Sequence, residues 1–289
     1  MPSSGRASVA RMVLHGAAAS ADRRDVAVSR EMLKAALRAL RGKGLNVAIL
    51  VTPAGFIDHK PGGTWSRSAG WGATQADFNM LAAAAADVAT ELASPEVRRL
   101  ARGTVEHLVL GIDVWPTERS EPHAETACVF DVATGIVLPV TGKSYPNTAQ
   151  QNDLIRNPDA GSHVIRLGKE RVAVLVCHDL AAWSPRGNAV AKGTRAGVWQ
   201  AMQDSVKLEQ PTLAVHLPHT VDTARTWSAA WTRFAGRSGG LLKSGTTAIR
   251  HLNRGWKPVF GPVDPKFLAG TTWGHAVVDV IIAGPRDAS

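Results

Sequence analysis

Short apolar segments of the kind that form buried strands alternate along this chain with amphipathic helical segments. Residues Ser29–Arg41 repeat apolar side chains every three to four positions, which predicts a helix with one buried face. The other predicted helices are Gln75–Ala93, Arg195–Leu208 and Thr223–Ala235. The predicted strands are Arg11–Gly16, Asn46–Val51, Glu106–Trp115, Glu125–Asp131, Ile136–Val140, His163–Leu167, Arg171–Val176, Thr212–Leu217, Thr246–His251 and Ala276–Ile282. Helix-alternating and hairpin-paired strands together predict an α/β domain with a mixed sheet or two stacked sheets.

The length and composition fit one ordinary globular domain. The 289 residues are 45% hydrophobic and 20% charged, which excludes a disordered chain, a collagen-like repeat and a coiled-coil rod. No linker or internal repeat divides the chain, so we expect a single domain over residues 1–289 with tails at 1–10 and 284–289. Two cysteines are too few for a disulfide framework, and no stretch of about 18 apolar residues occurs. These features predict a cytoplasmic protein that does not enter a membrane.

The chain is basic, with a net charge of +9, which permits an anionic partner without identifying one. Segment Pro211–Pro262 contains one acidic residue, Asp222. Its basic residues are Arg225, Arg233, Arg237, Lys243, Arg250, Arg254 and Lys257. They are spread over several predicted elements without a nucleic-acid-binding motif, so a solvated face is favoured and nucleic acid is not the expected partner. A polyanion-binding module stays open as an alternative.

The most specific local feature is an apolar strand, Val172–Val176, that ends at Cys177. In α/β proteins the carboxyl ends of strands carry ligand-facing groups. The thiolate is the reactive form of cysteine, and nearby positive charge favours it. Cys177 is therefore a candidate nucleophile, and the alternative is a small apolar residue at a strand end.

Two further positions lie near predicted strand ends. Lys143 follows a predicted hairpin strand, and a lysine can stabilise the oxyanion of a tetrahedral intermediate. The alternative is an exposed loop lysine. His219 follows another strand and is a candidate pocket residue. It cannot easily share a metal with His216, because strand positions three apart face opposite sides, so we expect no metal site.

Taken in order, these segments resemble the nitrilase, or carbon–nitrogen hydrolase, superfamily. Residues Val172–Leu180 resemble the strand that leads into that family's nucleophile, and Glu125–Gly135 followed by Lys143 resembles the hairpin that leads to its catalytic lysine. Thr212–Pro218 and Thr246–Asn253 resemble parts of its C-terminal half. The resemblance implies a four-layer αββα sandwich of two mixed sheets.

The resemblance also implies chemistry. Cys177 would attack an amide or nitrile carbon and form a thioester-type acyl-enzyme that water resolves. Lys143 and the backbone N–H of His178 would stabilise the oxyanion. His178, His219 and Trp183 are the candidate substrate-binding residues. The implied partner is a small-molecule amide or nitrile, no cofactor is implied, and a homo-oligomer is expected by resemblance only.

The sequence departs from the family at its general base. Ala54 occupies the place of the family's glutamate after the second strand, and only amides, Gln150 and Gln151, occur where many members have a second glutamate. Loss of a general base costs on the order of 10²–10⁴-fold in rate. Three residues are candidates for a base at another backbone position: Asp58, His59 and Glu125.

Three functions therefore remain open. The first is a divergent thiol-dependent carbon–nitrogen hydrolase with a relocated base. The second is a catalytically impaired binding or scaffold protein with the same fold, and the third is the polyanion-binding module. The loop Lys60–Gly72, which contains Trp65 and Trp71, either borders the pocket or forms a surface excursion.

Overall fold

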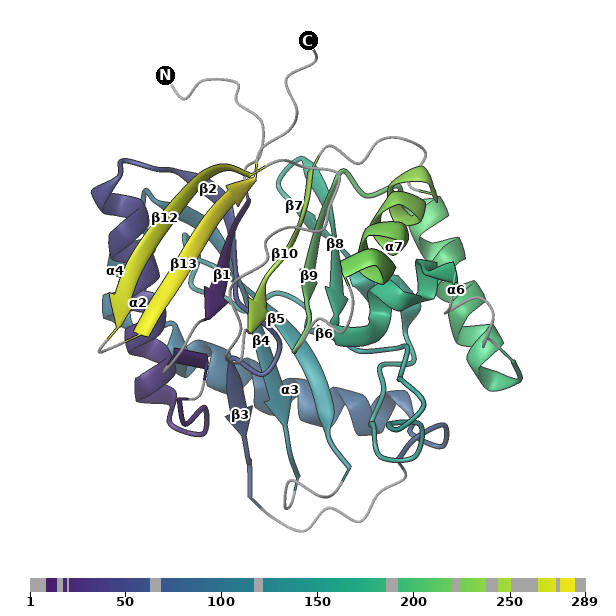
Figure 1. Cartoon of the computed structure of the whole chain (residues 1–289). Helices are drawn as coiled ribbons and strands as arrows, with labels where there is room; N and C mark the ends of the chain where they lie inside the picture. The colour runs from purple at the N-terminus through teal and green to yellow at the C-terminus, as the bar shows by residue number, and fades with distance from the viewer. Residues whose placement is uncertain are drawn as a thin grey trace.

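The computed structural model describes residues 9–14, 18–19, 21–62, 69–116, 122–185, 192–219, 224–237, 244–250, 265–273 and 276–283. These residues form two stacked β-sheets with helices on both outer faces (Figure 1). The expectation of a four-layer αββα sandwich with two mixed sheets is confirmed. No helix in these ranges combines the length and the apolar character that a membrane crossing requires.

The larger sheet runs in the order β12-β13-β1-β2-β4-β5-β6, with β3 beside β4 and β11 beside β1. β1, β2 and β4 are parallel neighbours, whereas β5 and β13 pair antiparallel with β4 and β1, so the sheet is mixed. Its strands are β1 (Val9–Leu14), β2 (Val47–Val51), β3 (Ile57–His59), β4 (Val105–Val114), β5 (Ala124–Asp131), β6 (Thr141–Gly142), β11 (Ile249–Arg250), β12 (Pro265–Trp273) and β13 (Ala276–Ala283).

The smaller sheet runs in the order β10-β9-β8-β7 and is also mixed, since β7 is antiparallel to β8 and the other pairs are parallel. Its strands are β7 (Val164–Leu167), β8 (Glu170–Val176), β9 (Leu213–Leu217) and β10 (Ser244–Thr247). The predicted hairpin formed by β7 and β8 is confirmed.

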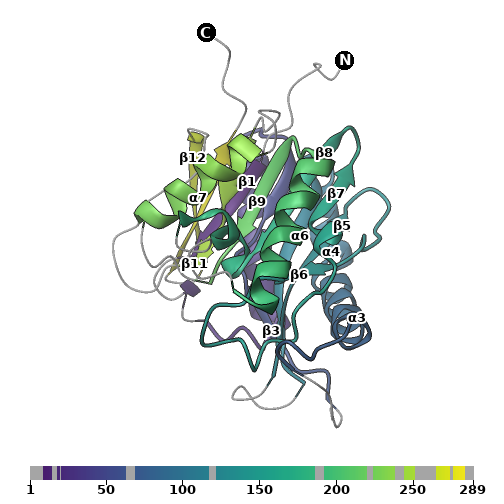
Figure 2. The same ribbon diagram turned by 90° about the vertical axis from the view of Figure 1, so that its right-hand side faces the viewer.

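Helices cover the outer face of each sheet. α2 (Val26–Gly42), α3 (Gln75–Leu92) and α4 (Pro95–Ala101) share one apolar cluster with the larger sheet. The helices α6 (Thr194–Glu209) and α7 (Ala224–Arg237) and the 3₁₀ helix η2 (Cys177–Trp183) share another cluster with the smaller sheet. Figure 2 shows α6 and α7 in front of β8 and β9. A short 3₁₀ helix, η1 (Ala160–His163), precedes β7.

The apolar run of β8 is continuous because both of its faces are buried. Val172, Val174 and Val176 pack between the two sheets, whereas Ala173 and Leu175 pack under α6 and α7. Alternate side chains of a strand point to opposite faces, so a strand between two apolar layers needs no polar positions. Cys177 directly follows this strand and therefore lies at its carboxyl end, where η2 begins.

The structure differs from the sequence expectations at several elements. Ile136–Val140 is not a strand: Val137 forms one isolated bridge with Phe130, Pro139 has no N–H to donate, and β5 pairs with β6 instead. The helix α4 and the strand β12 were not predicted. Residues 9 and 10, expected in a tail, belong to β1, and the remaining tail residues lie outside the described ranges.

Gly111 of β4 provides a test of the packing beside the end of β2. A Cβ atom at Gly111 would lie 2.2 Å from the Pro53 carbonyl oxygen and 2.7 Å from Ala54 Cα, which are backbone atoms that cannot rotate away. We expect Gly111→Ala to lower the free energy of unfolding by about 1–3 kcal/mol, as overpacking does. Chemical denaturation measures this change. Gly42→Ala is the control, because nothing lies within 4 Å of its Cβ position at the end of α2; an equal loss in both variants would contradict the expectation.

Candidate active site

Cys177 lies at the turn from β8 into η2 and has an unusual backbone conformation. Its φ angle is +48°, one of two positive values among the described non-glycine residues. Such a conformation costs about 1–3 kcal/mol and persists where neighbouring groups hold it. The side chain is half-buried and projects from the strand end. The strained turn is therefore a fixed support for the thiol.

A buried imidazole holds the carbonyl of this turn. His216 Nε2 lies 2.7 Å from the Cys177 carbonyl oxygen, and His216 Nδ1 lies 3.4 Å from Thr247 Oγ1. Burial lowers the pKa of His216 to about 3, so the ring is neutral at physiological pH and its Nε2–H donates to the carbonyl. His216 thus fixes the turn without adding charge to the site.

The buried Asp179 carboxylate connects the Cys177 turn to the segment after Lys143. Its Oδ1 accepts from the backbone N–H groups of Ser144 at 2.9 Å and Tyr145 at 2.8 Å, and its Oδ2 accepts from Val176 N–H at 3.1 Å. Burial raises the pKa of Asp179, while these N–H groups and nearby cations oppose the rise. One side chain therefore brings together two segments that are far apart in the sequence.

Lys143 is completely buried at the centre of the site. Its Nζ lies 3.3 Å from Cys177 Sγ and 3.0 Å from each Glu125 carboxylate oxygen, and it also donates to Gln150 Oε1. Burial by itself would lower the pKa of Lys143, but the Cys177 thiol and the Glu125 carboxylate raise it above its ordinary value. Lys143 is therefore an ammonium ion in contact with both the sulfur and the carboxylate.

Glu125, near the start of β5, is the carboxylate on the other side of Lys143. Burial would raise its pKa, yet Lys143, His219 and His123 hold the pKa well below its ordinary value. Gln150 Nε2 donates to its Oε1 at 2.6 Å, and His123 Nε2 lies 3.5 Å from the same oxygen. Glu125 is consequently an anion in a water-poor environment.

Strand register places three carboxylates side by side on one face of the larger sheet. Asp58 of β3 pairs with Asp113 of β4, and Asp113 pairs with Glu125 of β5. Paired residues of neighbouring strands present their side chains to the same face. Each carboxylate has its own cation, at 3.1, 2.7 and 3.0 Å: Arg23 with Asp58, His219 with Asp113, and Lys143 with Glu125. This carboxylate row forms the floor of the site.

His219 extends from the end of β9 toward the carboxylate row. Its Nε2 lies 2.7 Å from Asp113 Oδ2 and its Nδ1 lies 3.6 Å from Glu125 Oε2. Burial lowers the pKa of His219, but Asp113, Glu125 and Cys177 raise it well above its ordinary value. A Cβ atom on Gly55 would lie only 3.1 Å from His219 Nε2, so the imidazole occupies the space beside Gly55.

Four of the residues singled out in the sequence come together: Cys177, Lys143, Glu125 and His219. Asp113 was not anticipated. In the sequence Asp113 is recognisable only as a charged residue at the otherwise apolar end of the β4 segment. That it lies beside Glu125 follows from the register of β4 with β5.

The side chains of the other predicted site residues are held by other contacts. Asp58 is in the carboxylate row but is bound to Arg23. His59 follows it on the strand and faces the opposite side, where Glu91 and Asp87 of α3 raise its pKa against the larger lowering effect of burial. His178 packs between Tyr145 and Trp227, with ring centroids 6.4 and 6.3 Å away. Trp183 ends η2 and packs edge-to-face on Phe234 at 4.8 Å.

Some predictions fall largely outside the described residues. Residues 63–68 of the Trp-containing loop, including Trp65, are outside them. In the basic segment, the same holds for Lys243, Arg254, Lys257 and the side chains of Arg225, Arg237 and Arg250.

Glu125, Cys177 and His219 also form a group whose ligand atoms all lie within 4.8 Å of one another. Carboxylate, thiolate and imidazole are ligand types that zinc accepts. The Lys143 ammonium, however, lies 3.0 Å from the carboxylate and 3.3 Å from the sulfur, where its charge opposes a second cation. The arrangement fits acyl chemistry at sulfur better than metal coordination.

Comparison with known proteins identifies the fold. No protein-family model and no curated protein matches the sequence. Among solved structures, the fold is similar to an amidase from Nesterenkonia sp.. That structure has a TM-score of 0.54 and 16% sequence identity, and the alignment covers 98% of this chain and 92% of the amidase.

Two mutants of the amidase from Nesterenkonia sp. AN1 give the same result. A double mutant in complex with acrylamide has a TM-score of 0.54 at 16% identity over 98% of this chain and 92% of that chain. A single mutant, described as an amidase from the nitrilase superfamily, has a TM-score of 0.53 at 16% identity over 99% and 93%. The resemblance seen in the sequence is thereby confirmed at the level of the fold.

Asp179→Asn tests the connection between the Lys143 and Cys177 segments. The substituted amide would direct an N–H₂ group at a backbone N–H, so one hydrogen bond is replaced by an unsatisfied pair of donors. We expect the free energy of unfolding to fall by about 1–3 kcal/mol, measured by chemical denaturation. Asp204→Asn on the exposed face of α6 is the matched control. Equal stability of the two variants would show that Asp179 is not needed to join the segments.

Proposed function

We propose that this chain is a thiol-dependent carbon–nitrogen hydrolase that cleaves an amide or nitrile through an acyl-enzyme on Cys177. The observation that carries the proposal is the position of Lys143 Nζ, 3.3 Å from Cys177 Sγ and 3.0 Å from the Glu125 carboxylate. The similarity in fold supports it, because one solved structure of the amidase has the acetamide moiety of fluoroacetamide added covalently at its active-site cysteine.

In this mechanism Glu125 replaces the base that Ala54 cannot provide. The S–H bond of Cys177 breaks, its proton passes to the Glu125 carboxylate, and the sulfur forms a bond to the amide carbon. Glu125 is a weak base in the resting site because Lys143 and His219 hold its pKa low. Lys143 and His219 also stabilise the negative charge that the proton transfer leaves on the Cys177 sulfur. This stabilisation offsets the cost of protonating Glu125.

The remaining steps use the same groups. As the carbonyl becomes tetrahedral, its oxygen gains negative charge, which the Lys143 ammonium and the His178 N–H stabilise. The C–N bond then breaks and the amine leaves with the proton from Glu125. Water attacks the thioester with Glu125 as base, which releases the carboxylic acid and restores the thiol. With a nitrile, the Cys177 sulfur would bond to the nitrile carbon and Glu125 would pass the thiol proton to the nitrile nitrogen. The product is a thioimidate.

A catalytically impaired binding protein is the second candidate. It is favoured by Ala54 at the place of the family's glutamate and by the amides Gln150 and Gln151 where many members have a second glutamate. In that case the pocket would hold an amide without turning it over. The two proposals differ in whether Cys177 is activated and whether Glu125 affects the rate.

Thiol labelling at varied pH tests the activation of Cys177. We expect iodoacetamide to modify Cys177 at neutral pH about tenfold faster than a free thiol, because Glu125 accepts the proton while Lys143 and His219 lie beside the sulfur and stabilise its negative charge as it attacks. Cys128 is an internal control, since complete burial raises its pKa to about 12. Mass spectrometry of the digested protein gives both rates from one sample. Labelling of Cys177 no faster than that of Cys128 would support the impaired binding protein.

Glu125→Gln tests the relocated base. We expect kcat for hydrolysis of butyramide, followed by ammonia release, to fall by on the order of 10²–10⁴-fold. Glu106→Gln is the matched control, because Glu106 is exposed on the neighbouring strand β4. The far-ultraviolet circular dichroism spectrum of each variant establishes that it is folded. If folded Glu125→Gln protein retains the full rate, Glu125 is not the base.

A further inference from the structure

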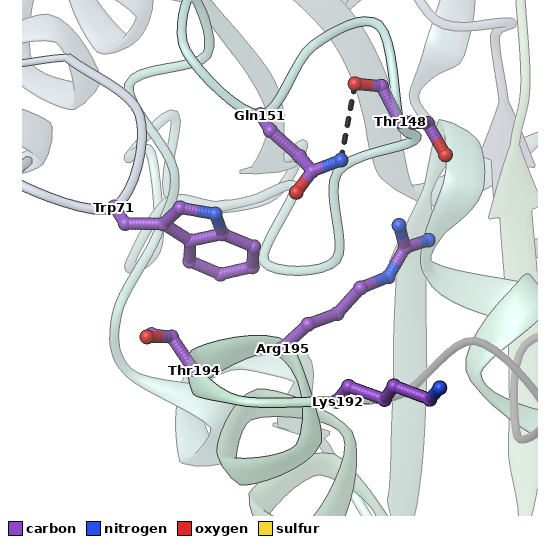
Figure 3. Close-up of a pocket in the computed structure, with 6 residues that line it drawn as sticks. All are labelled: Trp71, Thr148, Gln151, Lys192, Thr194 and Arg195. Carbon is purple, nitrogen blue, oxygen red and sulfur yellow. Dashed lines mark hydrogen bonds between the residues drawn. The ribbon is translucent and has the colours of Figure 1, made fainter.

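A second cavity, which the mechanism above does not use, lies beside the start of α6. Its volume is about 330 Å³. Trp71 lies on one side of it, and the ends of the Arg195 and Lys192 side chains lie on the other (Figure 3). The remaining lining residues are Thr148, Gln151 and Thr194. The described lining thus has two cations, an indole and several hydrogen-bonding groups, but no carboxylate. We refer to it as the α6 pocket.

Arg195 gives the α6 pocket a buried positive charge. Its side chain is almost fully buried, with 7% of the residue exposed. The guanidinium lies 4.4 Å above the Tyr145 ring, its Nε makes no hydrogen bond, and no carboxylate of the described residues is within ion-pair distance. A buried cation without a counter-ion is costly, and contact with an aromatic face compensates only part of that cost. An anion in the pocket would offset the rest of that cost.

The start of α6 adds to the positive potential of the pocket. This 16-residue helix has Gly193 at its N-cap, which provides no side-chain cap, and its first turn contains no acidic residue. The first N–H groups of a helix lack intrahelical partners and carry partial positive charge. Lys192 precedes the cap and Arg195 lies in the first turn. Three sources of positive potential thus face a single cavity.

Contacts of Tyr145 and the segment that ends at Gln151 link the α6 pocket to the candidate active site. The Arg195 guanidinium lies over the Tyr145 ring. The Tyr145 ring is nearly parallel to the His178 ring, and their centroids are 6.4 Å apart. Gln151 lines the pocket and directly follows Gln150, which hydrogen-bonds to both Lys143 and Glu125. The segment from Lys143 to Gln151 therefore borders the reacting groups and the cationic pocket.

We propose that the α6 pocket binds the carboxylate or phosphate at the far end of the substrate whose amide reaches Cys177. This inference rests on the proposed hydrolase function and narrows its substrates to amides that carry a negative group. Arg195 and Lys192 would bind the anion, and Trp71 would provide an apolar wall for the connecting carbon chain. A neutral alkyl amide would leave the Arg195 charge uncompensated.

Kinetics on matched substrates test the assignment. The monoamides of succinic, glutaric and adipic acid are compared with alkyl amides of the same chain lengths, by ammonia release. We expect the best monoamide to exceed its alkyl partner in kcat/KM by about tenfold or more, mainly through KM. Arg195→Gln should lower the ratio of the two kcat/KM values by about ten- to a hundredfold, which is the effect of a charged hydrogen bond.

Three further variants separate charge from structure. Arg195→Lys keeps the charge and should restore part of the ratio, and Lys192→Gln, at an exposed position, should lower it by a smaller factor. Arg166→Gln makes the same charge change at an exposed position on β7 and should leave the ratio at its wild-type value. A wild-type protein that does not prefer the monoamides, or a ratio unchanged in Arg195→Gln, would overturn the proposal.

Calorimetry distinguishes failure of this proposal from failure of the hydrolase function. Glutarate and inorganic phosphate are titrated into wild-type protein and into Arg195→Gln. If no amide is hydrolysed but glutarate binds and the binding depends on Arg195, the anion site stands and the hydrolase function fails. If neither anion binds, the anion site fails whatever the activity. Phosphate that binds without competing with the monoamide would assign the pocket to a separate anion and overturn its role in substrate binding.

Discussion

The site depends on the buried contact between Lys143 and Glu125. Both side chains are almost completely removed from water, and neither charge is tolerable there without the other. The pair is formed because β5 and β6 are neighbours: Lys143 N–H donates to the Glu125 carbonyl at 2.9 Å, so the two side chains start from adjacent backbone. Every other element of the site is arranged around this pair, with Cys177 on one side and Gln150 on the other.

The carboxylate row supplies acidic groups beside the end of β2, where the chain has Ala54 and no carboxylate. A chain that lacks a carboxylate at the end of β2 can place carboxylates on β3, β4 and β5 instead, because the register aligns Asp58, Asp113 and Glu125 on one face. Placing three like charges on one face is unfavourable unless each is neutralised. The cations come from a preceding loop, from the end of β9 and from the segment after β6, so the row also joins elements distant in the sequence.

The sequence pointed to Cys177 through a local pattern, and to Lys143 chiefly through the resemblance to a known family. The apolar strand that ends at Cys177 is a signal contained within a few residues, whereas the strand predicted before Lys143, Ile136–Val140, is not formed. The interaction of His219 with Asp113 spans 106 positions and depends on where β9 lies relative to β4. Sequence periodicity reports which side of a strand is buried but not which strands are neighbours, so Asp113 had no recognisable partner.

The misplaced strand has a similar cause. Ile136–Val140 is apolar enough for a strand, yet β5 has only one free edge there, and Thr141–Gly142 occupies it. Gly142 fits this position because a Cβ atom would lie 2.6 Å from the Phe78 ring and 2.8 Å from the Glu125 carbonyl oxygen. Packing against Phe78 of α3 thus favours Thr141–Gly142 over Ile136–Val140 as the strand beside β5, and α3 is distant in sequence from both segments.

Charge balance distinguishes the two cavities. In the candidate active site each described cation contacts a carboxylate, so the resting site is nearly neutral and can receive a neutral amide group without a large electrostatic cost. In the α6 pocket the charge of Arg195 is left without a carboxylate among the described residues, although its burial is comparable to that of Asp113. A fold tolerates a few kcal/mol of such cost only where the rest of the structure compensates. The proposed substrate would place its negative group at Arg195 and its neutral amide at the charge-balanced site.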